Sequence, residues 1–183
     1  SQILNNQVIM VTGAGGSIGS ELCMQIARFA PREIILFDIS EYNLYELDQQ
    51  FKRKFPNQKI TLKIADIRNL YKVEKIFKEL RPSMLYHAAA YKQVPMMESN
   101  PEEAILNNVL GTKILAIMAI KYGVSKFVMV SSDKAVNPTN VMGTTKRIAE
   151  MICNMFQSLQ SKTSFISVRF GNVLGSSGSV IPL

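Results

Sequence analysis

The sequence predicts an α/β fold built on a doubly wound parallel sheet. Short apolar segments alternate with segments of helical apolar spacing along most of the chain, which is typical of β-α-β units. A glycine-rich turn directly follows the first apolar segment, and an acidic residue ends the second. These two features favour a dinucleotide site at the edge of the sheet.

Three strand-helix pairs are expected in the first half of the chain. The expected elements are a strand at Val8–Thr12, a helix at 20–30, a strand at Glu33–Asp38, a helix at 40–55 capped by Ser40, a strand at Ile60–Ile64 and a helix at Leu70–Leu80. Each strand is a short apolar run, and each helix shows one apolar face.

The same alternation continues in the second half. The expected elements are a strand at Met84–His87, a helix at 101–122, a strand at 126–131, a helix at 142–160 and a strand at 165–169. Asn100 is the expected N-cap of the helix that starts at Pro101 and ends before Gly123. Right-handed crossovers then favour the strand order 3-2-1-4-5-6.

Composition limits the class of protein. The chain has 183 residues, 47% of them hydrophobic, and we expect a single dinucleotide-binding domain over residues 1–183. Its longest apolar run, 114–120, is far shorter than the roughly 18 residues of a membrane span, and the first residues lack the features of a signal peptide. We therefore expect a cytoplasmic location and no membrane contact from this chain.

The charge of the chain and its few metal-binding residues limit the classes of partner that we expect. The net charge is +7, but the cations between Lys52 and Arg81 lack interleaved aromatic residues, so we read them as a solvated face and expect no nucleic acid. Cys23 and Cys153 have no second ligand at metal-binding spacing and are expected to be packing residues. His87 is the only histidine, which argues against a metal site.

The glycine turn is the candidate phosphate cradle. Gly13, Gly16 and Gly19 follow the pattern GxxGxxG, and the backbone amides of this turn can approach a pyrophosphate. The intervening cofactor-binding candidates are Gly15, Ser17 and Ile18. A purely structural turn is the alternative.

Further cofactor-binding candidates follow the next strands. Asp38 can accept hydrogen bonds from both hydroxyls of an adenosine ribose and would repel a 2′-phosphate, so NAD is favoured over NADP. Asp66 and Ile67 can face the adenine, and the small residues Ala88, Ala89 and Ala90 let the backbone approach the dinucleotide. The alternatives are helix-start or surface-loop acids, and His87 is read as a hydrogen-bonded strand-end residue.

Candidate catalytic residues follow the fifth strand. Ser132, Asp133 and Lys134 place a hydroxyl, an acid and an amine at the carboxyl edge of the sheet, with a salt-bridged turn as the alternative. Met142 and Lys146 have the spacing of a YxxxK pair, with methionine in place of tyrosine. A solvated helix lysine is the alternative for Lys146.

The segments TGAGGSIGSEL, HAAAYKQVP, SSDKAVNPTNVMGTTKR and RFGNVLGSSGSV together resemble extended short-chain dehydrogenases, specifically the nucleotide-sugar 4,6-dehydratases of capsular polysaccharide biosynthesis. The resemblance covers residues 8–183. It implies a bacterial lyase that uses NAD to convert UDP-N-acetylglucosamine to a 4-keto-6-deoxy sugar, and a homo-oligomer is expected through the helices at 101–122 and 142–160.

The resemblance also implies individual roles. Lys134 would be the base at sugar carbon 5, Asp133 the acid at carbon 6, Ser132 a hydrogen-bonding partner of the sugar, and Lys146 the residue that holds the nicotinamide ribose. A raised pKa of Asp133 and a lowered pKa of Lys134 would suit these roles, and both shifts require a pocket that becomes dry once substrate is bound. Asn108 would order water, and the substrate-binding candidates are Lys92, Arg169, Gly171, Asn172 and Val173.

Two departures matter. Met142 departs from the wider short-chain dehydrogenase family, although the resembled capsular-type enzymes share this methionine. A thioether cannot accept a proton, which leaves the base at carbon 4 open, with Asp133 or a water as the alternatives. The carboxyl-terminal substrate lobe is missing, so we expect a fragment of a larger enzyme that is inactive alone and whose parent could be anchored to the inner membrane. The alternatives are a nucleotide-sugar epimerase, which would keep a tyrosine at position 142, and a non-catalytic NAD-binding regulatory domain.

Overall fold

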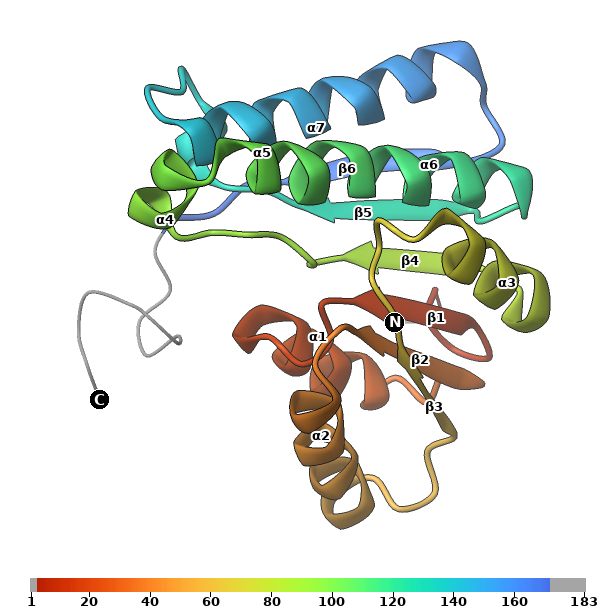
Figure 1. Cartoon of the computed structure of the whole chain (residues 1–183). Coiled ribbons are helices and arrows are strands. Elements are labelled where there is room, and N and C mark those ends of the chain that lie inside the picture. Colours follow the sequence, from red (N-terminus) through yellow and green to blue (C-terminus); the bar gives the residue numbers. More distant parts are fainter. Residues whose placement is uncertain (1–2, 172–183) are drawn as a thin grey trace.

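The computed structural model describes residues 3–171 and confirms the doubly wound sheet (Figure 1). Six parallel strands lie in the order β3-β2-β1-β4-β5-β6. The strands are β1 Val8–Thr12, β2 Glu33–Asp38, β3 Ile60–Ile64, β4 Met84–His87, β5 Lys126–Val130 and β6 Ser164–Val168. The helices are α1 Ser17–Ala27, α2 Glu41–Lys54, α3 Leu70–Leu80, α4 Val94–Ser99, α5 Pro101–Ala104, η1 Ile105–Gly111, α6 Thr112–Lys121, η2 Asp133–Ala135 and α7 Val141–Leu159.

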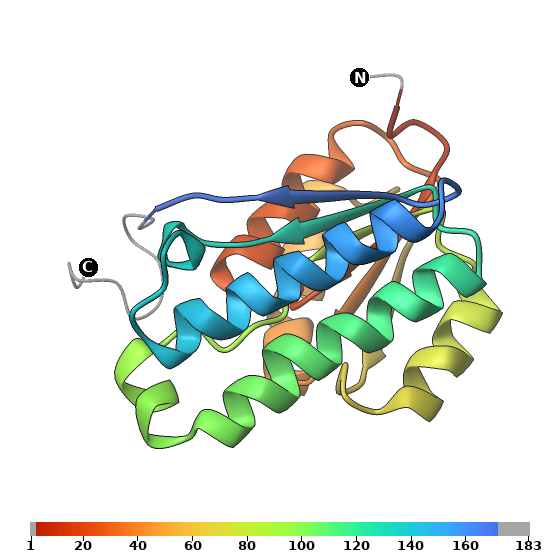
Figure 2. The same ribbon diagram turned by 90° about the horizontal axis from the view of Figure 1, so that it is seen from above.

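Helices cover both faces of the sheet, and each face has its own core. On one face α1 and α2 pack against β1 and β2, with Cys23 and Leu44 among the buried residues. On the other face α3, α6 and α7 lie side by side (Figure 2), with Leu115 and Cys153 in the core. Both cysteines are buried, which confirms them as packing residues.

Two helix starts differ from the prediction. The first helix begins at Ser17, not at residue 20, because the glycine turn leads directly into the first helical turn. Asn100 does not cap the next helix with its side chain: its Nδ2 donates to the Met96 carbonyl instead. This carbonyl belongs to α4, a short helix that the sequence analysis did not predict.

The helix expected at 101–122 is continuous in the chain but not uniformly α-helical. A π-helical stretch, η1, lies between α5 and α6. Such wide turns occur often at functional sites, and η1 carries Asn107 and Asn108.

Pro101–Lys121 is the one helix within residues 3–171 that is long and apolar enough to cross a membrane. Half of its apolar window is buried inside the fold. Length and composition alone are weak evidence for a span, because the core helix of an α/β domain passes the same test.

Candidate functional site

The glycine turn lies against the chain that leaves β4. Gly13 has φ +70°, and a Cβ there would come within 2.6 Å of the Ala89 backbone nitrogen. A Cβ on Gly19 would collide with the Gly13 carbonyl oxygen. The turn therefore has room only for glycine at these two positions.

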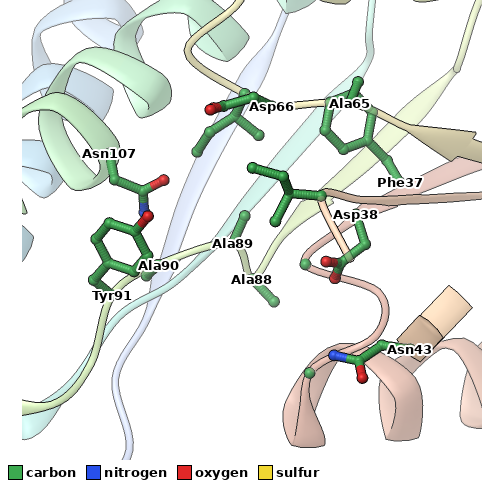
Figure 3. A pocket seen from close by; sticks show the side chains of 14 residues that line it. Phe37, Asp38, Asn43, Ala65, Asp66, Ala88, Ala89, Ala90, Tyr91 and Asn107 are labelled. Carbon is green, nitrogen blue, oxygen red and sulfur yellow. The ribbon is translucent and has the colours of Figure 1, made fainter. Parts of the chain in front are cut away.

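Backbone amides fix the carboxylate of Asp38. Gly15 N–H donates to Oδ2 over 2.8 Å, and Ser40 N–H donates to Oδ1 over 2.9 Å. These bonds hold the side chain at the end of β2, beside the glycine turn and facing the pocket drawn in Figure 3. A carboxylate held in this way can still accept further hydrogen bonds, because each oxygen has two acceptor positions.

A cavity of about 200 Å³ lies at the carboxyl ends of the first four strands (Figure 3). The structure brings together there most of the predicted cofactor-binding residues: Gly13, Gly16, Asp38, Asp66, Ile67, Ala88, Ala89 and Ala90. It adds lining residues that the sequence analysis did not name: Phe37, Ile39, Asn43, Ala65, Tyr91 and Asn107. Asn43 and Tyr91 lie within a few residues of named candidates, and this closeness in the sequence is what could have predicted them.

Asp66 is paired within the chain as well as lining the pocket. Its carboxylate accepts from the backbone amide of Arg68 over 2.8 Å and from the guanidinium over 2.7 to 3.0 Å. Burial raises the pKa of Asp66, but these bonds outweigh it and the pKa lies below its ordinary value. Arg68 also contacts Glu103 at the start of the helix that carries η1.

The turn Ser132-Asp133-Lys134 joins β5 to α7. Ser132 Oγ donates to Asp133 Oδ1 over 2.9 Å, and Lys134 Nζ donates to the same oxygen over 3.2 Å. These bonds lower the pKa of Asp133, the one from Ser132 most. The raised pKa that we expect in a dry, substrate-filled pocket is therefore not present in the chain without substrate, where the carboxylate is over half exposed and paired with an amine.

Lys146 and Met142 occupy adjacent turns of α7 but different surroundings. Lys146 Nζ donates to the Val130 carbonyl over 2.7 Å, and burial lowers its pKa to about 8. The Met142 side chain is buried in an apolar cluster with Met97 and Ala104. Met142 therefore packs α7 against α4 and α5.

Asn108 and His87 are both buried and hydrogen-bonded. The Asn108 side chain accepts from Tyr91 N over 2.9 Å and donates to Thr145 Oγ1 over 3.1 Å. The His87 ring lies between the hydroxyls of Thr12 at 2.8 Å and Thr112 at 2.9 Å. Both side chains tie together elements that surround the pocket.

The predicted substrate-binding residues do not gather in one place in the described part of the chain. Lys92 is exposed in the segment between β4 and α4. Gly171 lies near Asp133, whose Oδ2 would be 3.7 Å from a Cβ at that glycine. Arg169 uses both Nε and Nη2 to bind Glu150 on α7. Asn172 and Val173 lie outside the described residues.

The arrangement combines two chemical capabilities at one edge of the sheet. The pocket offers two carboxylates, Asp38 and Asp66, beside a glycine turn that exposes backbone to a ligand. The turn after β5 offers an acid and an amine, next to a buried lysine. Within residues 3–171 no cluster of three or more His, Cys, Asp or Glu side chains is arranged to hold a metal ion.

Comparison with protein families places the chain among known sequences. The model of a family described as polysaccharide biosynthesis protein matches residues 9–183. The capsular polysaccharide biosynthesis protein CapD of Staphylococcus aureus is 54% identical over all of this chain, which covers 31% of CapD. A UDP-glucose 4-epimerase of Rickettsia canadensis is 38% identical over 97% of this chain and 52% of its own length. The chain thus spans about a third to a half of the length of these relatives.

Solved structures have the same fold. The structure of Pen from Bacillus thuringiensis superposes with a TM-score of 0.90 at 36% identity, covering 97% of this chain and 54% of Pen. DesIV of Streptomyces venezuelae, a dTDP-glucose 4,6-dehydratase with NAD bound, has a TM-score of 0.76 at 19% identity, over 88% of this chain and 55% of DesIV. The second likeness shows the fold alone.

Proposed function

The chain belongs to the polysaccharide biosynthesis protein family, and from this premise we propose that it is the dinucleotide-binding half of a nucleotide-sugar 4,6-dehydratase. The proposed substrate is UDP-N-acetylglucosamine, and the product a UDP-4-keto-6-deoxy sugar for bacterial glycans. The observation that carries the proposal is the Asp133–Lys134 pair at the carboxyl edge of the sheet. The buried Lys146 lies beside the same strand end, because its Nζ donates to the carbonyl of Val130, the last residue of β5.

The pocket fits a nicotinamide dinucleotide. A Cβ at Gly13 would meet the Ala89 backbone nitrogen at 2.6 Å, so glycine here lets the turn pack against the chain that leaves β4. The start of α1, which directly follows the turn, would receive the pyrophosphate. Asp38, held by Gly15 and Ser40, offers acceptors to ribose hydroxyls. A 2′-phosphate near that carboxylate would be repelled, so the proposed cofactor is NAD and not NADP.

The proposed reaction removes water from the sugar. When bound, the nicotinamide supplies a hydride acceptor for carbon 4 and a hydride donor for carbon 6. Lys134 accepts the proton from carbon 5, which the neighbouring ketone has made acidic. Asp133 takes up the proton of the carbon 4 hydroxyl and gives it to the carbon 6 hydroxyl, which leaves as water. The proton held by Lys134 then returns to carbon 5.

The other residues of the site bind and orient. Ser132 hydrogen-bonds the sugar, and Lys146 holds the nicotinamide ribose. Asn108 keeps the chain after β4 in place through its two bonds to Tyr91, and its family role in ordering water stays a proposal. Asp133 is ionised and exposed in the structure, so it needs the dry surroundings of a bound sugar to act as an acid.

Met142 bears on the choice between dehydratase and epimerase. An epimerase relative is 38% identical to the chain, so this reaction is the second candidate. A tyrosine at position 142 would favour it, whereas the methionine here is buried in an apolar cluster and has no proton to exchange. The acid and amine at positions 133 and 134 also argue against a regulator that only binds NAD.

Incubation of the full-length protein with UDP-N-acetylglucosamine and NAD tests the proposal. Mass spectrometry of the nucleotide sugar should show the loss of one water. A product of unchanged mass but altered sugar stereochemistry would establish the epimerase instead. Binding of NAD with no change in any nucleotide sugar would support the regulator.

Assembly and location are further parts of the proposal. We propose a homo-oligomer that forms through the exposed apolar side chains of α5 to α7. We also propose that this part of the protein works in the cytoplasm, where nucleotide sugars are made, and that anchoring to the inner membrane belongs to other parts of a longer parent.

A further inference from the structure

A buried carboxylate lies beside the proposed catalytic turn. Glu150 is on α7, one helical turn after Lys146, and its side chain is 3% exposed. A buried charge is costly unless it is paired and hydrogen-bonded, so its partners indicate what the protein gains from it.

The partners of Glu150 come from the ends of two strands. Its Oε1 accepts from Ser131 Oγ over 2.6 Å and from Arg169 Nε over 2.8 Å. Its Oε2 accepts from Arg169 Nη2 over 2.6 Å. Ser131 directly follows β5, and Arg169 directly follows β6. A second cation, Arg147, lies at the exposed rim with Nη1 3.3 Å from Oε2.

Backbone hydrogen bonds also join the two segments that follow β5 and β6, and these bonds extend to the proposed catalytic residues. Ser131 N–H donates to the Val168 carbonyl over 2.7 Å, and Asp133 N–H donates to the Phe170 carbonyl over 3.1 Å. The segment that carries Asp133 is therefore paired with the segment that carries Arg169. Glu150 bridges these two segments from the helix side.

The helix also contacts the turn directly. A Cβ on Gly143, in the first turn of α7, would collide with the Lys134 carbonyl oxygen. The turn is thus contacted by α7 and by the chain after β6, while the Asp133 side chain stays exposed. Burial raises the pKa of Glu150, but the bonds from Arg169 and Ser131 outweigh it and keep the carboxyl ionised.

We propose that Glu150 is a positioning residue, which clamps Ser131 to Arg169 and so holds the turn of Ser132, Asp133 and Lys134 in its working place. The proposal rests on the proposed function for the role of that turn. It also gives Arg169 a place in the clamp, in contrast to the expectation that it binds the sugar.

Glu150→Gln in the full-length protein tests the clamp, because the amide keeps the shape but removes the charge and one acceptor. Hydrogen exchange followed by NMR or mass spectrometry should show opening at the amides of Ser131 and Asp133 about tenfold faster. In the dehydration assay kcat should fall about tenfold or more, with KM and the NAD content within about twofold of wild type.

Glu74→Gln is the matched control. Like Glu150, Glu74 is a helix carboxylate in an ion pair, here with Lys121, but it is partly exposed and lies on α3, away from the turn. This variant should leave kcat and the exchange of the Asp133 amide unchanged. If Glu150→Gln does not fold, Ser131→Ala removes one arm of the clamp with less disturbance and should change exchange and kcat in the same direction.

The two readouts separate this proposal from the proposed function. Unchanged exchange at Ser131 and Asp133 in a folded Glu150→Gln variant overturns the clamp, whatever the activity. A rise in KM at constant kcat also contradicts it, because a positioning residue acts on the reacting groups and not on affinity alone. A wild-type protein that dehydrates no nucleotide sugar refutes the proposed function, while the exchange result still decides on the clamp.

Discussion

The buried histidine illustrates how a single residue's hydrogen bonds decide its role. Thr112 Oγ1 donates to the Asn108 carbonyl over 2.6 Å, so the hydroxyl accepts from His87 Nε2–H. Nδ1 is then the acceptor for Thr12 Oγ1. Burial, and next the charge of Lys146, lower the pKa of His87 to about 3. The ring is therefore neutral and fully hydrogen-bonded, which agrees with a strand-end residue and not with a base.

Lys134 gives the first prediction at this scale. Lys134→Met in the full-length protein should reduce dehydration about 10²- to 10⁴-fold, because the proton at carbon 5 loses its acceptor. NAD affinity should change little, since Lys134 does not line the pocket. A rate assay and calorimetry measure the two quantities. The control is Lys121→Met, which removes an exposed lysine on α6; near-normal dehydration in Lys134→Met would return this residue to a salt-bridged turn.

Asp38 gives the second prediction. Calorimetry should find that the chain binds NAD more tightly than NADP, because a 2′-phosphate would approach a carboxylate held in place by two amides. Asp38→Asn should weaken NAD binding about tenfold or more, since hydrogen bonds to a charged acceptor are lost. Asp48→Asn, in an α2 ion pair with Lys52, is the control. Equal or tighter binding of NADP by the wild type would refute the role of Asp38.

Positions at strand ends were the easiest to predict from the sequence. Asp38, Gly13 and Gly16 could be placed at one pocket because each lies directly at or after the end of a strand. Asn107 could not, because a π-helical stretch 69 residues later brings it to the same pocket. The lowered pKa of Asp133 in the chain without substrate could not be predicted either, since it depends on the geometry of bonds from Ser132 and Lys134.

At the scale of elements, strands were easier to predict than helix starts. All six strands were found within one residue at each end, because a buried parallel strand is an apolar run with clear limits. The helix α4 was missed because it has only six residues and lacks a side-chain cap. The π-helical stretch η1 has no sequence pattern of its own; it forms where Gly111 packs so closely on Ile67 that a Cβ would lie 2.5 Å from Ile67 Cδ1.

The glycine turn gives a prediction for an element. Gly13→Ala should weaken dinucleotide binding at least tenfold, because an alanine Cβ would meet the backbone of Ala88 and Ala89 at 2.6 to 2.7 Å and displace the turn. Gly123→Ala is a matched control: Gly123 has φ +74°, but no atom lies within 4 Å of a Cβ there. Both variants should lose about 1–2 kcal/mol of stability from the left-handed backbone alone. Thermal melting and calorimetry measure the two effects, and equal dinucleotide affinities of the two variants would contradict the prediction.

At the scale of the whole molecule, the length of the chain relative to its relatives leads to a prediction. The chain spans 54% of the Pen structure, yet it holds the whole pocket at the ends of β1 to β4. The 183-residue chain should therefore bind NAD but turn over no nucleotide sugar, because orientation of the sugar supplies much of the rate. Calorimetry measures the binding of NAD, and mass spectrometry measures any conversion of the nucleotide sugar. Dehydration by this chain alone would show that the sugar site is complete within it.

The helix Pro101–Lys121 has apolar side chains on its exposed side as well as on the side that it buries. Packing against the sheet explains only the buried ones. Its exposed side chains include Leu106 at 41% and Leu110 at 40%, and those of the neighbouring α7 include Met151 at 57% and Met155 at 46%. The two helices lie side by side (Figure 2). We call the exposed apolar side chains of Pro101–Lys121 and of α7 together the α6–α7 face, and we propose that a second copy of the chain buries it.

Substitution within the α6–α7 face tests this assembly. The wild-type chain should sediment as a dimer or larger oligomer, and Leu110→Glu combined with Met151→Glu should sediment as a monomer, because association would bury two charges on each copy. Circular dichroism should remain unchanged, since both side chains are exposed and make no contribution to the two cores. Tyr71→Glu changes an apolar side chain that is 77% exposed on α3, outside the face, and should leave the oligomer intact. A monomeric wild type, or a double variant that still associates, would contradict this assembly. The α6–α7 face would then be covered by another part of the parent chain. Sedimentation of the full-length protein would in that case show an assembly that is insensitive to these two substitutions.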